Sequence, residues 1–142
     1  MKNQVIPNSD HVARHCKAST APDGEIQATA FLLREGEEFL SVNWLEELKC
    51  PDRTSEVRAL QNLYARKMTR VGAGARIAIL NVGRIVTKVE NDGVDKRVLR
   101  VLHEPEPDDP SHAGIFGISY DDREIVAELI VQEVLKSYAA RT

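Results

Sequence analysis

Two segments with apolar residues at helical spacing lie among segments rich in β-branched residues, and this mixture limits the fold more than any other feature. Residues 54–70 carry apolar side chains three and four positions apart, and residues 121–140 repeat the pattern over a longer run. Such spacing places the apolar residues on one face of a helix. Both segments are therefore predicted to be helices that pack against another layer.

The other apolar segments have the features of strands. Residues 26–33 and 38–42 are rich in β-branched and large apolar residues and are separated by a polar turn, which predicts a β-hairpin. Residues 76–80 predict a buried strand, and the alternation over 97–103 predicts a strand with one exposed face. Residues 82–90 fit both helical and alternating patterns, and we assign them to a strand.

The remaining segments complete an α+β order of elements. Short helices are expected over 10–16 and 44–49, each after a residue that can cap a helix. Residues 104–119 contain three prolines and two glycines, which predicts a long ordered loop. We predict a single compact α+β domain over residues 1–142, with a mainly antiparallel sheet covered by helices.

The composition narrows the range of functions. The chain has 142 residues with a net charge of −3, which opposes non-specific binding of nucleic acid. The two cysteines, Cys16 and Cys50, and a start without an apolar signal segment predict reduced thiols in the cytoplasm. No apolar run approaches the roughly 20 residues that span a bilayer, so we expect no membrane insertion.

The first candidate functional segment combines an acid, a histidine and an arginine. Within the helix predicted over 10–16, Asp10, His11 and Arg14 would share one turn, which suits an anion site. His11 and His15 would project from one face and could be two ligands of a metal ion. A metal site needs three or four ligands, and we interpret His15 as an exposed side chain. No metal or cofactor is predicted.

The second candidate is the proline-rich loop, where His112 follows Asp109. A carboxylate bonded to one ring nitrogen would leave the other nitrogen of His112 free as a general base. The structural alternative is that Asp109, Pro110 and Ser111 form an Asx turn and His112 braces the loop against the sheet.

The third candidate is the segment that presents Ser41, Asn43 and the single tryptophan, Trp44. An aromatic wall beside a few polar groups is typical of ligand sites. The simpler interpretation is that Trp44 belongs to the core.

Three blocks of sequence resemble those of a group of small uncharacterised bacterial proteins. They are HVARHC at 11–16, LSVNWLE at 40–46 and DPSHAGI at 109–115. The resemblance implies a bacterial and cytoplasmic origin and carries over no catalytic residue.

Three functions remain open, because no phosphate loop, nucleophile elbow or dinucleotide fingerprint is present. The favoured one is a protein-interaction or accessory module. The second is a small hydrolase or transferase acting on a phosphate-containing or nucleotide-like substrate. In it, His112 would be the general base, Asp109 its orienting group, Arg14 the anion clamp and His11 a second acid or base.

The third is a nucleic-acid-binding or toxin-linked component that uses the basic end of helix 54–70. We expect a protein partner or a small anionic ligand before nucleic acid or a membrane. The enzyme hypothesis requires His11, Arg14 and the loop 108–112 to meet in space.

Overall fold

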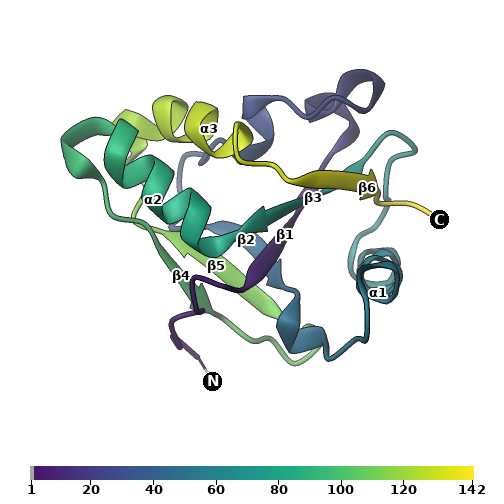
Figure 1. Ribbon diagram of the computed structural model, residues 1–142. Helices are drawn as coiled ribbons and strands as arrows, with labels where there is room; N and C mark the ends of the chain where they lie inside the picture. Colours follow the sequence, from purple (N-terminus) through teal and green to yellow (C-terminus); the bar gives the residue numbers. More distant parts are fainter. Residues whose placement is uncertain (1) are drawn as a thin grey trace.

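Residues 2–142, which the computed structural model describes, form a six-stranded antiparallel sheet with helices on both faces (Figure 1). The strands lie in the order β4-β5-β2-β1-β3-β6. They are β1 (His11–Cys16), β2 (Leu40–Trp44), β3 (Arg76–Asn81), β4 (Arg100–His103), β5 (His112–Phe116) and β6 (Lys136–Ala139). The main helices are α1 (Arg53–Lys67), α2 (Val82–Asp92) and α3 (Arg123–Val131). The predicted α+β class with a mainly antiparallel sheet is confirmed.

The two faces of the sheet are buried by different helices. α1 covers one face, where its Val57 and Leu60 share a core cluster with Ile77 and Ile79 of β3. α2 and α3 cover the other face. A strand that is buried on both faces needs apolar residues at successive positions, which explains the continuous apolar run in β3.

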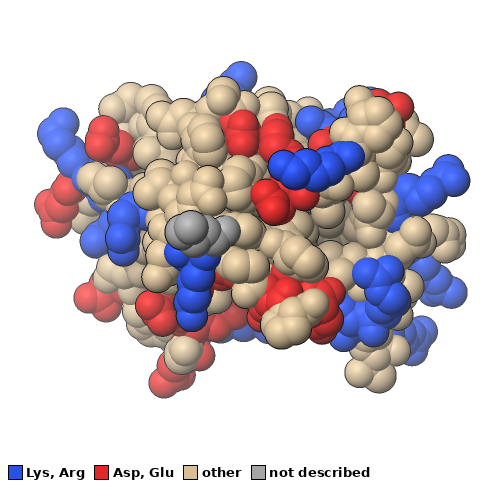
Figure 2. Space-filling view, turned by 90° about the horizontal axis from the view of Figure 1, so that it is seen from below, with Lys and Arg blue, Asp and Glu red and all other residues tan. Residues whose placement is uncertain are grey.

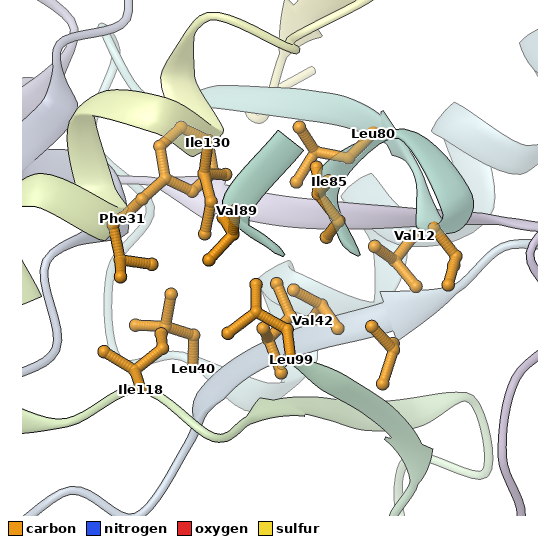
Figure 3. Close-up of a cluster of buried hydrophobic side chains, with 14 of the residues drawn as sticks. Val12, Phe31, Leu40, Val42, Leu80, Ile85, Val89, Leu99, Ile118 and Ile130 are labelled. Atoms are coloured by element: carbon orange, nitrogen blue, oxygen red, sulfur yellow. The ribbon is translucent and has the colours of Figure 1, made fainter. Parts of the chain in front are cut away.

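The larger core lies between the sheet and the pair formed by α2 and α3 (Figure 3). Ile85 and Val89 of α2 and Ile130 of α3 face Leu40 of β2 and Phe31, all of them fully buried. Phe31 comes from a short 3₁₀ helix, η3 (Ala28–Phe31), that packs against α3.

Both long central helices begin at a capping side chain. Asp52 accepts a hydrogen bond from the backbone N–H of Ser55 (2.8 Å) at the start of α1. Asn81 accepts one from the backbone N–H of Arg84 (2.9 Å) at the start of α2. Such caps satisfy backbone donors that have no partner within the helix. The helix predicted over 54–70 is confirmed as α1.

The strand predicted over 82–90 is wrong, because this segment forms α2. Val82, Ile85 and Val89 are buried and stand three and four residues apart, so they occupy one helical face. Helical spacing, supported by the Asn81 cap, decides between the two patterns.

The helix predicted over 10–16 is also wrong, because the segment pairs between two strands as β1. The hairpin predicted from 26–33 and 38–42 does not form. Its first half contains η3, and its second half becomes β2, which pairs with β1 and β5. Partners distant in sequence override the local pattern in each case.

Two predictions near the C-terminus are correct only in part. The loop predicted over 104–119 contains β5, where a Cβ on Gly114 would overlap the Phe39 ring, so that glycine permits close packing. The helix predicted over 121–140 ends at Val131 and is followed by β6, which pairs with β3.

The other short elements match the sequence more closely. The strands expected over 76–80 and 97–103 are present as β3 and β4, and the helix expected over 44–49 is reduced to a 3₁₀ turn at Glu46–Leu48.

The sheet is weakly joined at its centre. β1 pairs with β3 along its whole length, from His11 to Cys16. It pairs with β2 only at Val12 and Ala13, after which the two strands separate. Within residues 2–142, the next residues of β1 therefore have no partner strand on that side, and they face an opening.

The surface carries charges of both signs. Figure 2 shows the underside of the view in Figure 1, where acidic side chains gather near the centre and basic side chains lie toward both the left and the right edges. No helix within residues 2–142 has the length and apolar character required to cross a membrane.

Candidate functional site

A cavity of about 470 Å³ lies where β1 and β2 separate. Its walls come from β1, η3, β2, the end of α1 and the segment that leads into β5. The candidate residues that line it are Arg14, Ser41, Asn43, Asp109 and His112. Arg14 and His112, which the enzyme hypothesis requires to meet, therefore share one cavity.

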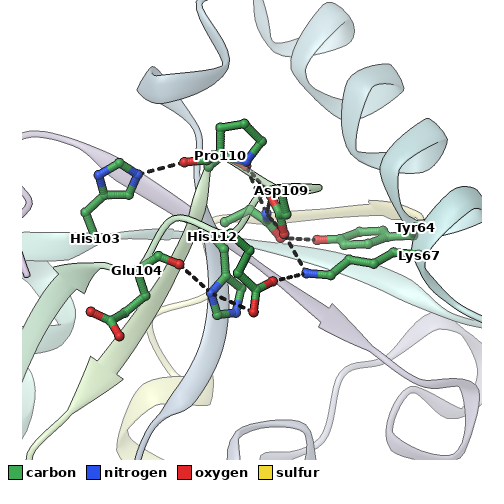
Figure 4. A network of polar contacts seen from close by, with 10 residues as sticks. Tyr64, Lys67, His103, Glu104, Asp109, Pro110 and His112 are labelled. Atoms are coloured by element: carbon green, nitrogen blue, oxygen red, sulfur yellow. Dashed lines mark hydrogen bonds and ion pairs between the residues drawn. The ribbon is translucent and has the colours of Figure 1, made fainter. Parts of the chain in front are cut away.

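His112 is held in this cavity with one ring nitrogen engaged. Its Nδ1 lies 2.9 Å from the backbone carbonyl oxygen of Glu104 (Figure 4), and the Phe39 ring packs against it edge-on. A carbonyl oxygen only accepts hydrogen bonds, so Nδ1 carries the proton and Nε2 is the acceptor in the neutral ring. Within residues 2–142, no hydrogen bond engages Nε2.

Asp109 is not the group that orients His112, which corrects the role predicted for it. Its carboxylate is only 2% exposed and accepts hydrogen bonds from Asn43 Nδ2 (3.0 and 3.1 Å) and Ser111 Oγ (3.1 Å). It also forms a 2.8 Å ion pair with Lys67 Nζ (Figure 4). The orienting group of His112 is the Glu104 carbonyl.

The Asp109 network continues into α1. Tyr64 Oη donates to Asn43 Oδ1 (3.0 Å), and burial, with the nearby negative charge of Asp109, raises the Tyr64 pKa far above its usual value. Lys67 also pairs with Glu106 at 2.8 Å. Partial burial lowers the Lys67 pKa, but hydrogen bonds to the two carboxylates outweigh it and raise that pKa overall. The loop before β5 is thus fastened to the end of α1.

Arg14 is held in a different way. Its Nε donates to the carbonyl oxygen of Ala30 (3.0 Å) and its Nη1 to that of Ser41 (2.8 Å). Within residues 2–142, no carboxylate lies within ion-pair distance of its guanidinium, and Nη2 makes no hydrogen bond. Burial lowers the Arg14 pKa, although an arginine remains protonated in a protein. Arg14 is a partly buried cation in the cavity wall that forms no ion pair with the described residues, although the charge of Glu37 in the same lining opposes part of the burial effect.

The cavity as a whole is positively charged. Four cationic residues and two carboxylates line it, an excess of two positive charges in a chain whose net charge is −3. A concave surface lined by one sign of charge concentrates ions of the opposite sign. The lining charges are Arg14, Lys17, Arg34 and Lys67, against Glu37 and Asp109.

His15 and Cys16 complete the β1 side of the cavity. The His15 ring packs edge-on against Tyr64 (5.0 Å between centroids) and is not the exposed side chain we predicted. Its Nε2 is buried without a hydrogen-bond partner among the described residues. Burial, and then the charge of Arg14, lower the His15 pKa, whereas burial raises the Cys16 pKa to about 11. The β1 side of the cavity therefore holds a neutral imidazole, packed toward α1, and a protonated thiol on the opposite face of the strand.

His11 and Trp44 lie outside the cavity lining. His11 Nδ1 lies 2.9 Å from Glu46 Oε2. Trp44 Nε1 donates to Asp10 Oδ2 (2.9 Å), and its ring packs against His103. Their contacts attach β1 and β2 to neighbouring segments.

The two histidines of β1 are also poorly placed to share a metal ion. On a strand, four residues span about 13 Å, so His11 and His15 point to the same side but cannot meet. Among the described residues, no group of three or more His, Cys, Asp or Glu side chains could hold a metal ion.

Sequence reasoning did not assign Tyr64, Lys67 or His15 to the site. In the sequence, Tyr64 fits the apolar spacing of residues 54–70, and Lys67 belongs to the basic end of that segment. The spacing of three between Tyr64 and Lys67 was the available signal, because residues three apart share a helical face.

Comparison of the chain with protein-family models, with curated proteins and with solved structures gives no match.

Proposed function

We propose that this protein binds a small ligand with an oxyanion group, a phosphate or a carboxylate, in the cavity between β1 and β2. The observation that carries the proposal is Arg14, which lines the cavity and whose guanidinium hydrogen-bonds, among residues 2–142, to two backbone carbonyls and to no carboxylate. A partly buried charge is costly when it is not neutralised. An oxyanion in the cavity would neutralise Arg14 and accept a hydrogen bond from Nη2.

The other lining groups suit the same ligand. Lys17 and Arg34 are exposed at the cavity and add to its positive potential. His112 Nε2 is a hydrogen-bond acceptor, so it fits a hydroxyl or another donor on the ligand. The ligand therefore carries an anionic group near Arg14 and a donor near His112.

A second candidate function is a small hydrolase or transferase that acts on such a ligand. The Glu104 carbonyl fixes the proton on His112 Nδ1, which leaves Nε2 to remove a proton from water or a ligand hydroxyl. Cys16 is unsuited as a nucleophile near neutral pH, because burial raises its pKa to about 11. His11 takes no part in this version, since it lies outside the cavity lining.

The interaction-module and nucleic-acid hypotheses have weaker support. At the basic end of α1, Lys67 is already paired with Asp109 and Glu106. Arg76 donates to Ser137 Oγ at 3.0 Å. The face in Figure 2 mixes both signs of charge and offers no continuous basic surface to a nucleic acid. A protein partner would be recognised on a surface other than this cavity.

The test is a calorimetric titration of the full chain with inorganic phosphate, pyrophosphate and small dicarboxylates. We expect one of these classes to bind, and Arg14→Met to weaken binding by roughly 10- to 150-fold, the value of one charged hydrogen bond. Arg58→Met, an exposed arginine of α1 outside the cavity, is the matched control and should bind like the wild type.

A second variant guards against misfolding of Arg14→Met. Arg34 is exposed and its side chain makes no hydrogen bond within residues 2–142, so Arg34→Met should fold and bind several-fold more weakly. Equal affinities in all four proteins, or no binding of any oxyanion by the wild type, would refute the proposal.

A further inference from the structure

An apolar groove of about 460 Å³ lies between η3 and α3. Ala28 and Leu32 line it from the η3 segment, and Ile125 and Leu129 line it from α3. Ile125 is 46% exposed, and its exposed surface belongs to this groove. The groove leaves apolar surface in contact with water, which a ligand could remove.

The groove and the cavity meet at one residue. Thr29 is exposed and lines both. Ala30, which follows Thr29, accepts a hydrogen bond from Arg14 Nε at its carbonyl oxygen. Ala28, which precedes Thr29, lines the groove. Ala28 and Ala30 are separated by about 4 Å along the 3₁₀ axis, and the exposed side of Thr29 between them is surface that both sites share.

The residues that line the two sites carry net charges of opposite sign. The cavity has an excess of positive charge, whereas the charged residues that line the groove are Glu124 and Glu128, with no cation among them. An anionic group is therefore attracted to the cavity and repelled from the groove. An uncharged apolar chain suits the groove and not the polar cavity.

We propose that the ligand is an amphiphilic anion, with an oxyanion head at Arg14 and an aliphatic chain that passes Thr29 into the groove between η3 and α3. This inference rests on the proposed function and extends it from a head group to a class of molecule. The ligand is a dispersed single-chain molecule and not a bilayer, because the acidic groove and the net charge of −3 oppose an anionic membrane surface.

The test is calorimetry of the full chain with methyl, butyl, hexyl and octyl phosphate below their aggregation limits, together with the matching alkyl carboxylates. Burial of each methylene should tighten binding about fourfold until the groove is filled. This dependence in either series supports the inference and identifies the head group. Equal affinity for methyl and octyl compounds overturns the inference and leaves the proposed function intact.

A pair of variants tests whether the aliphatic chain of the ligand occupies the groove. Ile125→Glu places a charge in the groove and should bind octyl phosphate no more tightly than the wild type binds methyl phosphate. Leu135→Glu changes another apolar residue that is 46% exposed but lines neither site, and it should keep the full chain-length dependence. Equal effects of the two variants would overturn the inference.

The remaining outcomes separate the two proposals. If no phosphate or carboxylate binds at any chain length, the proposed function fails and the inference fails with it. If the protein binds only vesicles that contain phosphatidic acid, the ligand is a membrane surface and the inference of a dispersed amphiphile is overturned.

Discussion

Asp109 and His112 stand three residues apart in one segment and line one cavity, yet their surroundings differ completely. The Asp109 carboxylate is bonded by Asn43, Ser111 and Lys67. His112 is bonded through Nδ1 alone, and its Nε2 has no partner within residues 2–142. A buried polar group whose bonds are all made within the chain stabilises the fold, whereas a group with an open atom at a cavity is available to a ligand.

The same difference separates the two cations on opposite sides of the cavity. Lys67 pairs with the carboxylates of Glu106 and Asp109, while the hydrogen bonds of the Arg14 side chain to the described residues all go to carbonyl oxygens. The α1 side is thus neutralised from within, and the β1 side is not. Substitutions on the α1 side should change stability, and those at Arg14 should change ligand binding.

The largest expected effect is that of Asp109→Ala on stability. The substitution removes a buried carboxylate that accepts hydrogen bonds from Asn43, Ser111 and Lys67. Lys67 keeps Glu106 and Asn43 keeps Ser111 as partners, so the loss is that of several hydrogen bonds to a charged group, and the free energy of unfolding should fall by about 3–5 kcal/mol. Urea denaturation followed by circular dichroism measures it. Asp108→Ala is the matched control, because Asp108 is exposed, and it should change stability by less than about 0.5 kcal/mol. Similar losses in both variants would contradict the structural role of Asp109.

Some of this fold could be predicted from the sequence because it is specified locally. The apolar face of α1 is complete within 15 residues, and β3 is a continuous apolar run. β1 and β5 depend on partners elsewhere in the chain: Val12 of β1 pairs with Leu80. No local pattern encodes such a pairing, and a charged, histidine-containing segment such as 11–16 resembles a surface helix until its partners are known.

The site was predicted in part for a related reason. Arg14, Asn43 and His112 lie on three strands that the sheet brings together, and unusual residue types marked each segment. The hydrogen-bond partners of these side chains could not be predicted. His112, for example, is oriented by a backbone carbonyl, a group that every residue carries and that no sequence pattern marks. Asp109 was the nearest carboxylate in sequence, but its acceptor sites are filled by Lys67 and other donors.

The next effect is the pH dependence of stability that Cys16 contributes. Burial raises its folded-state pKa from 9.0 to about 11, so the unfolded chain loses the thiol proton first as the pH rises. The contribution is fully present below pH 9 and is lost as the pH rises to about 11. A shift of this size corresponds to about 2–3 kcal/mol.

Cys16→Ala isolates this contribution. The pKa of Tyr64 is also raised, so Tyr64 adds its own loss of stability at alkaline pH. Wild type and variant share that loss, and it cancels in the difference between their free energies of unfolding. Urea denaturation at pH 8, 9, 10 and 11 should show the difference declining across the interval. A constant difference would mean that the Cys16 thiol is accessible to water and that the β1 side of the cavity is more open than described.

The smallest expected effect is that of Tyr64→Phe. The variant keeps the buried ring but removes the hydroxyl that donates to Asn43 Oδ1, so one buried acceptor is left unsatisfied. The free energy of unfolding should fall by about 1–2 kcal/mol. Tyr138→Phe is the matched control, since the Tyr138 hydroxyl makes no hydrogen bond within residues 2–142, and it should change stability by less than about 0.5 kcal/mol. If Tyr64→Phe also changes the free energy of unfolding by less than about 0.5 kcal/mol, the Tyr64 hydroxyl does not help to hold Asn43. The stabilising hydrogen bonds on that side of the cavity would then be those of Asn43 with Asp109 and Ser111, and α1 would not contribute to them through Tyr64.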